Sequence, residues 1–304
     1  MGVVDVLNRT YNGIAMSAFS RYPPGRNIYS REWDLLILLD ACRIDALRQV
    51  APEYDYLQEI DSHMSTGSSS PEFLAATFTE EHRDEVSRTA YVSGNAHSEF
   101  VFENRRMPED QKNAYVHWTD WDTVAASTFG LLDHVWRYTE RMEAGPCDPA
   151  NLIDRTVRVG RERELDRVIV HFHQPHAPYV SHPEREGREP ESYEKNPFEA
   201  IRNGVRRGRV WQSYLDELRY ILDQLPLLLT NFEADTAVVS ADHGELFGNY
   251  LYSHPSGLLH PKLRWVPWAK VDATDEGSYE PEVERTNEVI HPASERLRDL
   301  GYID

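Results

Sequence analysis

The sequence predicts an α/β protein with an open sheet, and the main evidence is two apolar runs that each lead to an acidic residue. Residues 236–240 are small or β-branched, as in a buried strand, and Asp242, His243 and Gly244 follow them. Residues 35–39 are apolar and lead to Asp40. Because open α/β sheets bind their ligands at the carboxyl ends of the strands, we expect Asp40, Asp242 and His243 to meet at one edge of the sheet.

These three side chains suit a divalent cation. Carboxylate oxygens are the preferred ligands of hard cations, and imidazole nitrogen binds several transition metals. The donor set leaves zinc, manganese, calcium and magnesium open as the metal.

The remaining elements follow from apolar spacing and from turn residues. Further strands are predicted at residues 54–61, 89–93, 167–172 and 263–267, and helices at 2–20, 41–50, 70–78, 198–229 and 293–300. Residues 100–165 are polar, aromatic and helix-prone, so we expect a helical cap there, and the charged segment 181–197 is predicted to be a mobile loop. We expect a helical lead-in over 1–32 and a single domain over 33–304.

A serine-rich loop precedes the helix predicted at 70–78. Pro71 suits the first helical turn, so Ser70 would cap the helix. The positive end of the helix dipole favours an alkoxide there, and also the phosphate that it would acquire. Ser70 is therefore a candidate nucleophile, and a plain helix cap is the alternative interpretation.

Two histidines and one arginine are further candidates for contact with a substrate. His176 lies between two prolines that restrict its backbone, and His254 follows the acidic strand end farther along the chain. We expect these rings to reach a bound phosphate from opposite sides, one as a proton donor and the other as an anion ligand. Arg43 can face a substrate anion, or it can pair with Asp45 or Asp40.

The charge balance restricts the partners. The 304 residues include 51 acidic and 32 basic ones, the formal net charge is −19, and only four residues are lysines. This charge argues against nucleic acid, which requires a basic surface. A lysine-poor acidic surface suits a protein that stays soluble in concentrated salt, so we expect a halophilic source, and an ordinary acidic protein is the alternative.

The sequence also bears on the compartment. Two cysteines, Cys42 and Cys147, are too few for a disulfide framework. No apolar run approaches the roughly 20 residues that span a bilayer, and the N-terminus lacks the pattern of an export signal. We expect a cytoplasmic protein without a transmembrane segment, and the oligomeric state stays open.

Four ordered motifs resemble the sulfatase-like branch of the alkaline phosphatase superfamily, and they cover about residues 33–270. They are a strand that leads to Asp40, the Ser69-Ser70-Pro71 element, the Pro-His-x-Pro-Tyr element around His176, and the Ser-x-Asp-His-Gly-Glu motif of residues 240–245 with His254 and Val266-Pro267 after it. The resemblance implies a three-layer sandwich with a mostly parallel central sheet and helices on both faces. It gives the metal ligands as Asp40, Ser70, Asp242 and His243.

The resemblance implies a metal-dependent hydrolase or transferase that acts on small-molecule, glycan or polyol phosphate esters through a serine and a phosphoryl-enzyme intermediate. Sulfatases that mature a cysteine or serine to formylglycine carry an arginine shortly after the proline, whereas Phe73 and Leu74 follow Glu72 here. This departure favours phosphate esters. A sulfatase and an inactive metal-binding or anion-binding relative stay as alternatives. Ser69 is the alternative nucleophile, because the family places its hydroxyl either directly before the proline or one residue earlier.

Overall fold

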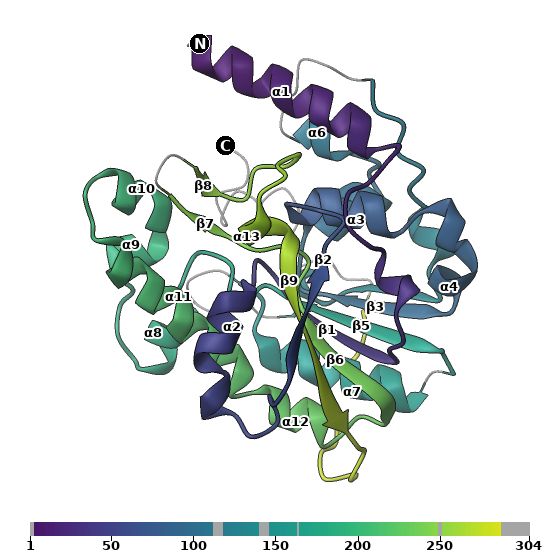
Figure 1. Cartoon of the computed structure of the whole chain (residues 1–304). Helices are drawn as coiled ribbons and strands as arrows, with labels where there is room; N and C mark the ends of the chain where they lie inside the picture. Colours follow the sequence, from purple (N-terminus) through teal and green to yellow (C-terminus); the bar gives the residue numbers. More distant parts are fainter. Residues whose placement is uncertain (1–2, 112–117, 140–145, 163, 249–250, 287–304) are drawn as a thin grey trace.

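A seven-stranded sheet lies at the centre of the computed structural model, with helices on both of its faces (Figure 1). The structure describes residues 3–111, 118–139, 146–162, 164–248 and 251–286. The strands are β1 (Leu35–Leu39), β2 (Ile60–Met64), β3 (Thr89–Ser93), β4 (Leu131–His134), β5 (Arg167–Phe172), β6 (Ala234–Ser240), β7 (Leu246–Phe247), β8 (Tyr252–Ser253) and β9 (Trp265–Ala273). The helices are α1 (Val3–Phe19), α2 (Ile44–Val50), α3 (Ser70–Thr77), α4 (Arg83–Ser87), α5 (His97–Phe102), α6 (Pro108–Gln111), α7 (Pro149–Glu162), α8 (Ser181–Arg185), α9 (Ser192–Lys195), α10 (Pro197–Arg202), α11 (Arg207–Leu222), α12 (Leu225–Leu229) and α13 (Pro261–Arg264).

The central sheet is mostly parallel. Its strand order is β2-β9-β6-β1-β5-β3-β4, and β7 and β8 form a separate pair. Strands β6, β1, β5, β3 and β4 run parallel to one another, whereas β9 runs antiparallel to both of its neighbours, β6 and β2. The carboxyl ends of β6, β1, β5 and β3 therefore lie along one edge of the sheet, which is where such sheets bind ligands.

Strand β1 shows why both faces of the sheet are covered. All five of its residues are buried, and alternate side chains point to opposite faces. Leu35, Ile37 and Leu39 join a core with helices α2, α7, α11 and α12, whereas Leu36 and Leu38 join a second core with α3 and α4. Burying one such side chain contributes about 1.5–3 kcal/mol, so each face requires a layer of helices. The predicted three-layer α/β arrangement is confirmed.

Several predicted elements have different bounds in the structure; the strand predicted at 263–267, for example, is β9 at Trp265–Ala273. The second strand covers Ile60–Met64 rather than 54–61, because the N–H groups of Tyr54 and Leu57 close turns after α2. The single helix predicted at 198–229 is wrong, since that stretch forms α10, α11 and α12. Gly204 interrupts it with a φ of 96°, and Pro226, which has no N–H to donate, lies at the start of α12.

Two regions predicted to lie outside the sheet contain more regular structure than expected. Residues 100–165 supply the edge strand β4 and the long helix α7, so the expected helical cap describes this region incompletely. Residues 181–197 contain α8 and α9 rather than an irregular loop. The closing helix predicted at 293–300 lies outside the described residues.

The N-terminal helix α1 forms where the apolar spacing predicts it, and it contacts α6 (Figure 1). The chain then packs Ile28, Tyr29 and Trp33 into the second core, which ties the lead-in to the sheet. Among the described residues, no helix is both long and apolar enough to cross a membrane.

A buried carboxyl group joins α11 to the segment that carries α8. Glu217 Oε2 accepts the backbone N–H of Ser181 at 3.0 Å and that of His182 at 3.3 Å. Burial raises the pKa of Glu217 to about 8. This carboxyl group therefore holds a proton in the folded protein at neutral pH.

We expect Glu217 to make the protein less stable as pH rises from about 4.5 to about 8, and Glu217→Gln to remove this contribution. In that window the folded protein keeps the proton, whereas the unfolded chain, with its ordinary carboxyl pKa of 4.5, has lost it, so a rise in pH favours unfolding. The measurement is the urea unfolding free energy of both proteins across the window. The difference between the two unfolding free energies cancels the effect of the other titrating groups. An unfolding free energy that changes equally with pH in the wild type and in Glu217→Gln would contradict the prediction.

Candidate active site

Asp40 stands directly after β1, where the chain turns toward α2. The next residue, Ala41, has a φ of 59°, in the left-handed region that costs a non-glycine residue about 1–2 kcal/mol. The Ala41 N–H donates to Asp242 Oδ1 at 3.2 Å. This turn joins the ends of β1 and β6, so the structure brings Asp40 and Asp242 together.

Asp242 and His243 follow β6, and the chain passes close to α13 at Gly244. The carbonyl oxygen of Lys262 would lie 2.0 Å from a Cβ atom at position 244, and the Gly244 N–H donates to the carbonyl oxygen of Leu263 at 2.8 Å. Glycine is required here by this close approach rather than by a left-handed turn. Asp242 Oδ1 also accepts the backbone N–H of His243 at 2.8 Å, which fixes the carboxylate.

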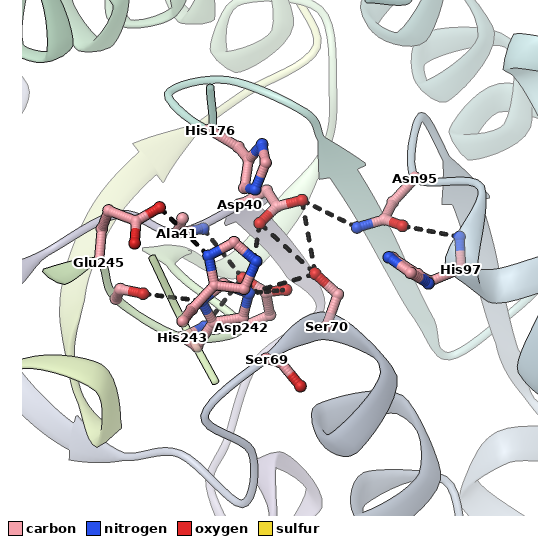
Figure 2. Close-up of polar contacts among 12 residues, drawn as sticks. Asp40, Ala41, Ser69, Ser70, Asn95, His97, His176, Asp242, His243 and Glu245 are labelled. Atoms are coloured by element: carbon pink, nitrogen blue, oxygen red, sulfur yellow. Dashed lines mark hydrogen bonds and ion pairs between the residues drawn. The ribbon is translucent and has the colours of Figure 1, made fainter. Parts of the chain in front are cut away.

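The His243 ring presents one nitrogen to the acidic centre. Its Nδ1 lies 2.8 Å from the carbonyl oxygen of Gly244, which can only accept, so Nδ1 carries the proton. Nε2 then has a lone pair, and it lies 3.4 Å from Asp40 Oδ1, 3.5 Å from Asp242 Oδ2 and 3.2 Å from Ser70 Oγ. Three oxygen-bearing side chains thus face the lone pair of one imidazole (Figure 2).

The sequence predicts Ser70 as the cap of this helix. In the structure Ser69 is the N-cap, and Ser70 is the first residue of α3. The Ser70 hydroxyl lies 3.5 Å from both oxygens of Asp40 and is directed toward His243 (Figure 2). The Ser69 hydroxyl lies 2.6 Å from Ser256 Oγ instead. Ser70, rather than Ser69, therefore contacts the carboxylate centre.

A buried ion pair holds the serine loop in place. Glu72 pairs with Arg264 at 2.6 Å, and its carboxylate also accepts the N–H groups of Ser68 and Gly257 at 3.0 and 2.9 Å. Both charged side chains are almost fully buried. Removing one partner of such a pair typically costs about 3–5 kcal/mol, because the other charge is left uncompensated. The network therefore fixes the position of the Ser70 hydroxyl.

The first cluster is formed by the side chains of Asp40, Ser70, Asp242 and His243. A second cluster of His176, Glu245 and His254 adjoins it, and the three possible ligand atoms of the second cluster lie within 4.8 Å of one another. The centroid of the His254 ring is 4.8 Å from that of His176 and 4.5 Å from that of His243. The expectation that His176 and His254 reach a phosphate from opposite sides is wrong, because the loops after β5 and β8 bring the two rings into contact.

Hydrogen bonds and burial set the protonation of this second cluster. Glu245 Oε2 lies 3.1 Å from His254 Nδ1, and Glu245 Oε1 accepts the N–H of Leu246 at 2.9 Å. Burial raises the pKa of Glu245 to about 8. Burial, together with the neighbouring rings of His254 and His243, holds the pKa of His176 well below its ordinary value. Near neutral pH, Glu245 therefore retains a proton beside His254.

Three side chains of the site have no role in the sequence-based prediction: His171, Asn95 and Glu245. His171 Nε2 lies 3.5 Å from Asp242 Oδ2, and its ligand atom groups with those of Asp40 and Asp242 within 4.8 Å. Asn95 Nδ2 donates to Asp40 Oδ2 at 2.9 Å. His171 lies near the carboxyl end of β5, which is next to β1, and Asn95 follows β3, which is next to β5, so the strand order was the missing signal. Glu245 closes the Asp-His-Gly-Glu motif, where its spacing from Asp242 was a usable signal.

Asp40 and Asp242 are fully buried and close together, so both cannot be ionised without a compensating charge. Burial and the charge of Asp242 raise the pKa of Asp40 well above its ordinary value. Burial acts in the same direction on Asp242, but the neighbouring His243 and His171 outweigh it and lower the pKa of that carboxyl. The pair holds one proton unless a cation replaces it.

The first cluster has the properties of a divalent cation site. Asp242 Oδ2 and His171 Nε2 are buried without a hydrogen-bond partner among the described residues, although burying an unpaired polar atom costs about 1–3 kcal/mol. Carboxylate, hydroxyl and imidazole ligands together suit zinc or manganese. Asp40, Asp242, His243 and the Ser70 hydroxyl therefore fit a divalent cation, with His171 beside them.

Arg43 lies at the margin of this centre. Its Nε donates to Asp45 Oδ1 at 2.8 Å, so the ion pair, one of its two predicted roles, is present. Its guanidinium also lies over the Trp211 ring, 4.6 Å from the centroid, and Nη1 donates to the carbonyl oxygen of Glu245 at 3.4 Å. Arg43 therefore contacts the backbone of the second cluster and not the carboxylates of the first.

Comparisons with known proteins give a likeness of fold alone. No protein-family model matches the chain, and no curated protein matches it. Among solved structures, a 2-O GAG sulfatase is 10% identical with a TM-score of 0.47, over 79% of this chain and 64% of that one. The soluble domain of lipooligosaccharide phosphoethanolamine transferase A from Neisseria meningitidis is 16% identical with a TM-score of 0.48, over 78% and 75%. An alkaline phosphatase superfamily protein from Vibrio parahaemolyticus is 14% identical with a TM-score of 0.42, over 90% and 69%.

Two of these structures are named as a sulfatase and as an alkaline phosphatase superfamily protein, and the sequence motifs resemble the same group. This chain spans 64% of the length of the first of them. Identities of 10–16% and TM-scores below 0.5 leave the chemistry to be inferred from the site itself.

We expect the protein to bind a divalent cation and Asp242→Asn to abolish that binding. Asparagine keeps the oxygen that accepts the N–H groups of Ala41 and His243, but it replaces Oδ2 with an amide nitrogen that cannot bind a metal. A cation at 100 times its Kd stabilises the folded state by about 2.7 kcal/mol. Calorimetric titration, and thermal melts with zinc or manganese against chelator, measure both effects.

The control is Asp235→Asn, which makes the same charge change at the other end of β6 and should leave binding intact. Asp242→Asn protein that binds the cation with wild-type affinity would contradict the assignment. A stoichiometry of two ions would place the second in the cluster of His176, Glu245 and His254.

Proposed function

We propose that this protein is a metal-dependent hydrolase or transferase of phosphate esters, with Ser70 as the nucleophile. The observation that carries the proposal is the position of the Ser70 hydroxyl, which lies 3.2 Å from His243 Nε2 and 3.5 Å from both oxygens of Asp40. A serine that only capped a helix would not require buried carboxylates around its hydroxyl.

Asp40, Asp242, His243 and Ser70 would hold the cation. When bound, the cation supplies positive charge that lowers the pKa of the serine hydroxyl and offsets the charge of a phosphate. Asn95 keeps Asp40 in position through its hydrogen bond of 2.9 Å. The chain thus orients these groups before a substrate arrives, which is the main protein contribution to such a site.

Ser70 Oγ would give its proton to the Asp40 carboxylate, 3.5 Å away, and attack phosphorus, and the bond from phosphorus to the oxygen of the leaving alcohol would break. The phosphoserine that results lies at the start of α3, where the helix dipole favours negative charge. Water or a second alcohol then takes the phosphoryl group from Ser70, which gives hydrolysis or transfer.

The leaving alcohol requires a proton, and the second cluster supplies one. Glu245 and His254 lie 3.1 Å apart and hold a proton near neutral pH, because burial raises the pKa of Glu245 to about 8. His254 would pass this proton to the leaving oxygen. His176, whose ring lies 4.8 Å from that of His254, would contact the phosphate once the anion raises its pKa.

Two features support phosphate over sulfate esters. Phe73 and Leu74, in the stretch where formylglycine sulfatases carry an arginine, are buried in the second core, so this stretch supplies no arginine of its own. Ser69, the alternative nucleophile, pairs with Ser256 rather than with the carboxylates. An unmodified Ser70 therefore supports phosphate chemistry.

We expect Ser70→Ala to lower the turnover of nitrophenyl phosphate by at least about 10,000-fold, because losing a catalytic nucleophile has effects of this order or larger. Intact-mass measurement after rapid quench should find a phosphoryl adduct on the wild type and none on Ser70→Ala. Ser69→Ala is the matched control, and it should keep both the adduct and turnover within about tenfold, since the Ser69 hydroxyl contacts Ser256 and not the carboxylates.

The same assay separates the competing functions. Faster turnover of nitrophenyl sulfate than of the phosphate would favour a sulfatase, and no turnover of either ester by metal-loaded protein would favour a binding role. An adduct that survives both serine substitutions would exclude this loop as the source of the nucleophile.

We expect His254→Ala to slow alkyl phosphate esters about 100-fold to 10,000-fold more than nitrophenyl esters, because nitrophenol leaves without a proton. His176→Ala should slow both types alike, since contact with the phosphate does not depend on the leaving group. The kcat/KM values of each variant on matched alkyl and nitrophenyl esters test this. Equal losses on both types for His254→Ala would exclude it as the proton donor.

A further inference from the structure

A pocket of about 670 Å³ lies beside the candidate centre, between the start of α2, the start of α11 and the chain that leads into α13. This volume accommodates a small organic ligand. Leu246, Phe247 and Trp211 form its apolar wall, and the rings of Trp211 and Phe247 lie 5.3 Å apart. Ser70 and the proposed metal ligands do not line it, so the pocket is distinct from the reacting centre.

The pocket is positively charged. Arg43, Arg207 and Lys262 line it, and Asp45 is its one carboxylate. Asp45 pairs with Arg43 at 2.8 Å, and Lys262 Nζ lies 3.9 Å from it. Among the described residues that line the pocket, three side chains carry a permanent positive charge and one carries a negative charge, so the lining favours anions on a chain whose net charge is −19. His260, which also lines it, adds a polar ring.

The pocket and the centre share a wall. The Glu245 carboxyl group faces His254 at 3.1 Å, and the next two residues, Leu246 and Phe247, line the pocket. Arg43 closes the same wall, since its Nη1 donates to the carbonyl oxygen of Glu245 at 3.4 Å. The pocket therefore adjoins the cluster of His176, Glu245 and His254 across the Glu245 backbone.

We propose that this pocket binds a second acidic group on the alcohol part of the substrate. Arg207 and Lys262 bind that group, and the apolar wall of Leu246, Phe247 and Trp211 contacts the carbon skeleton between the two acidic groups. The inference rests on the proposed function and deepens it, because it selects phosphate esters of sugars or polyols that carry a further phosphate, sulfate or carboxylate.

The test is calorimetric titration of Ser70→Ala protein, which binds without turnover, at one fixed metal concentration. The probes are glucose 1-phosphate, glucose 1,6-bisphosphate and glucuronic acid 1-phosphate, so that a second phosphate and a carboxylate are compared with no second acid. We expect the bisphosphate to bind at least about tenfold more tightly than the monophosphate, since one charge-assisted hydrogen bond contributes roughly this factor. The affinity for glucuronic acid 1-phosphate shows whether a carboxylate can replace the second phosphate in the pocket.

Replacing Arg207 and Lys262 with alanine together should lower the affinity for the bisphosphate to that for the monophosphate and leave the monophosphate affinity within about twofold. Both side chains are exposed, so the fold does not depend on them. The control is the pair Arg206→Ala and Lys270→Ala, which removes the same two charges at exposed positions that do not line the pocket. Equal affinities for the two glucose phosphates, or an equal loss in the control pair, would overturn the proposal.

Turnover of nitrophenyl phosphate by the wild type reports on the proposed function separately. Turnover without any preference for the bisphosphate overturns the role of the pocket alone. A bisphosphate preference that depends on Arg207 and Lys262, without turnover of any ester, supports the pocket and overturns the proposed function.

Discussion

The structure depends on three carboxylates, Asp40, Asp242 and Glu245, that are buried together at the carboxyl edge of one sheet. Burying like charges in a medium of low dielectric constant is costly, so the surrounding groups must supply protons or positive charge. The raised pKa values of Asp40 and Glu245 show the first response. The neighbouring His243 and His171 lower the pKa of Asp242, so that carboxyl group keeps its negative charge. A divalent cation would satisfy the remaining negative charge, which is why we expect a metal-dependent function.

The scaffold makes this arrangement possible through a few close contacts. Parallel strands end on one edge, so β1, β6, β5 and β3 deliver side chains from distant parts of the sequence to one place. Ala41 accepts a left-handed backbone there, and Gly244 allows α13 to approach within the space that a side chain would fill. The buried pair of Glu72 and Arg264 then holds the loop that carries Ser70. Local strain and a buried ion pair, both unfavourable in isolation, are thus concentrated around one hydroxyl group.

The distribution of charge separates two parts of the site. The acidic centre suits a cation, whereas the adjoining pocket, with Arg43, Arg207 and Lys262, suits an anion, although the chain as a whole is strongly acidic. A phosphate ester with a second acidic group matches both parts at once. Glu245 borders both parts, and in the proposed reaction its carboxyl group would supply the proton for the leaving alcohol.

The sequence by itself determined the α/β fold class and the two strand ends that carry Asp40, Asp242 and His243. The apolar strands predict that Asp40, Asp242 and His243 lie at the sheet edge. This prediction is possible from sequence because each of these residues lies shortly after its strand in the chain. Tertiary structure alone shows which of the two serines contacts the carboxylates, since the Ser69 hydroxyl contacts Ser256 and the Ser70 hydroxyl contacts Asp40. It also decided the strand order, which brings His171 and Asn95 to the centre. Contacts of this kind join residues far apart in sequence, and no local pattern of spacing or hydrophobicity records which strands become neighbours.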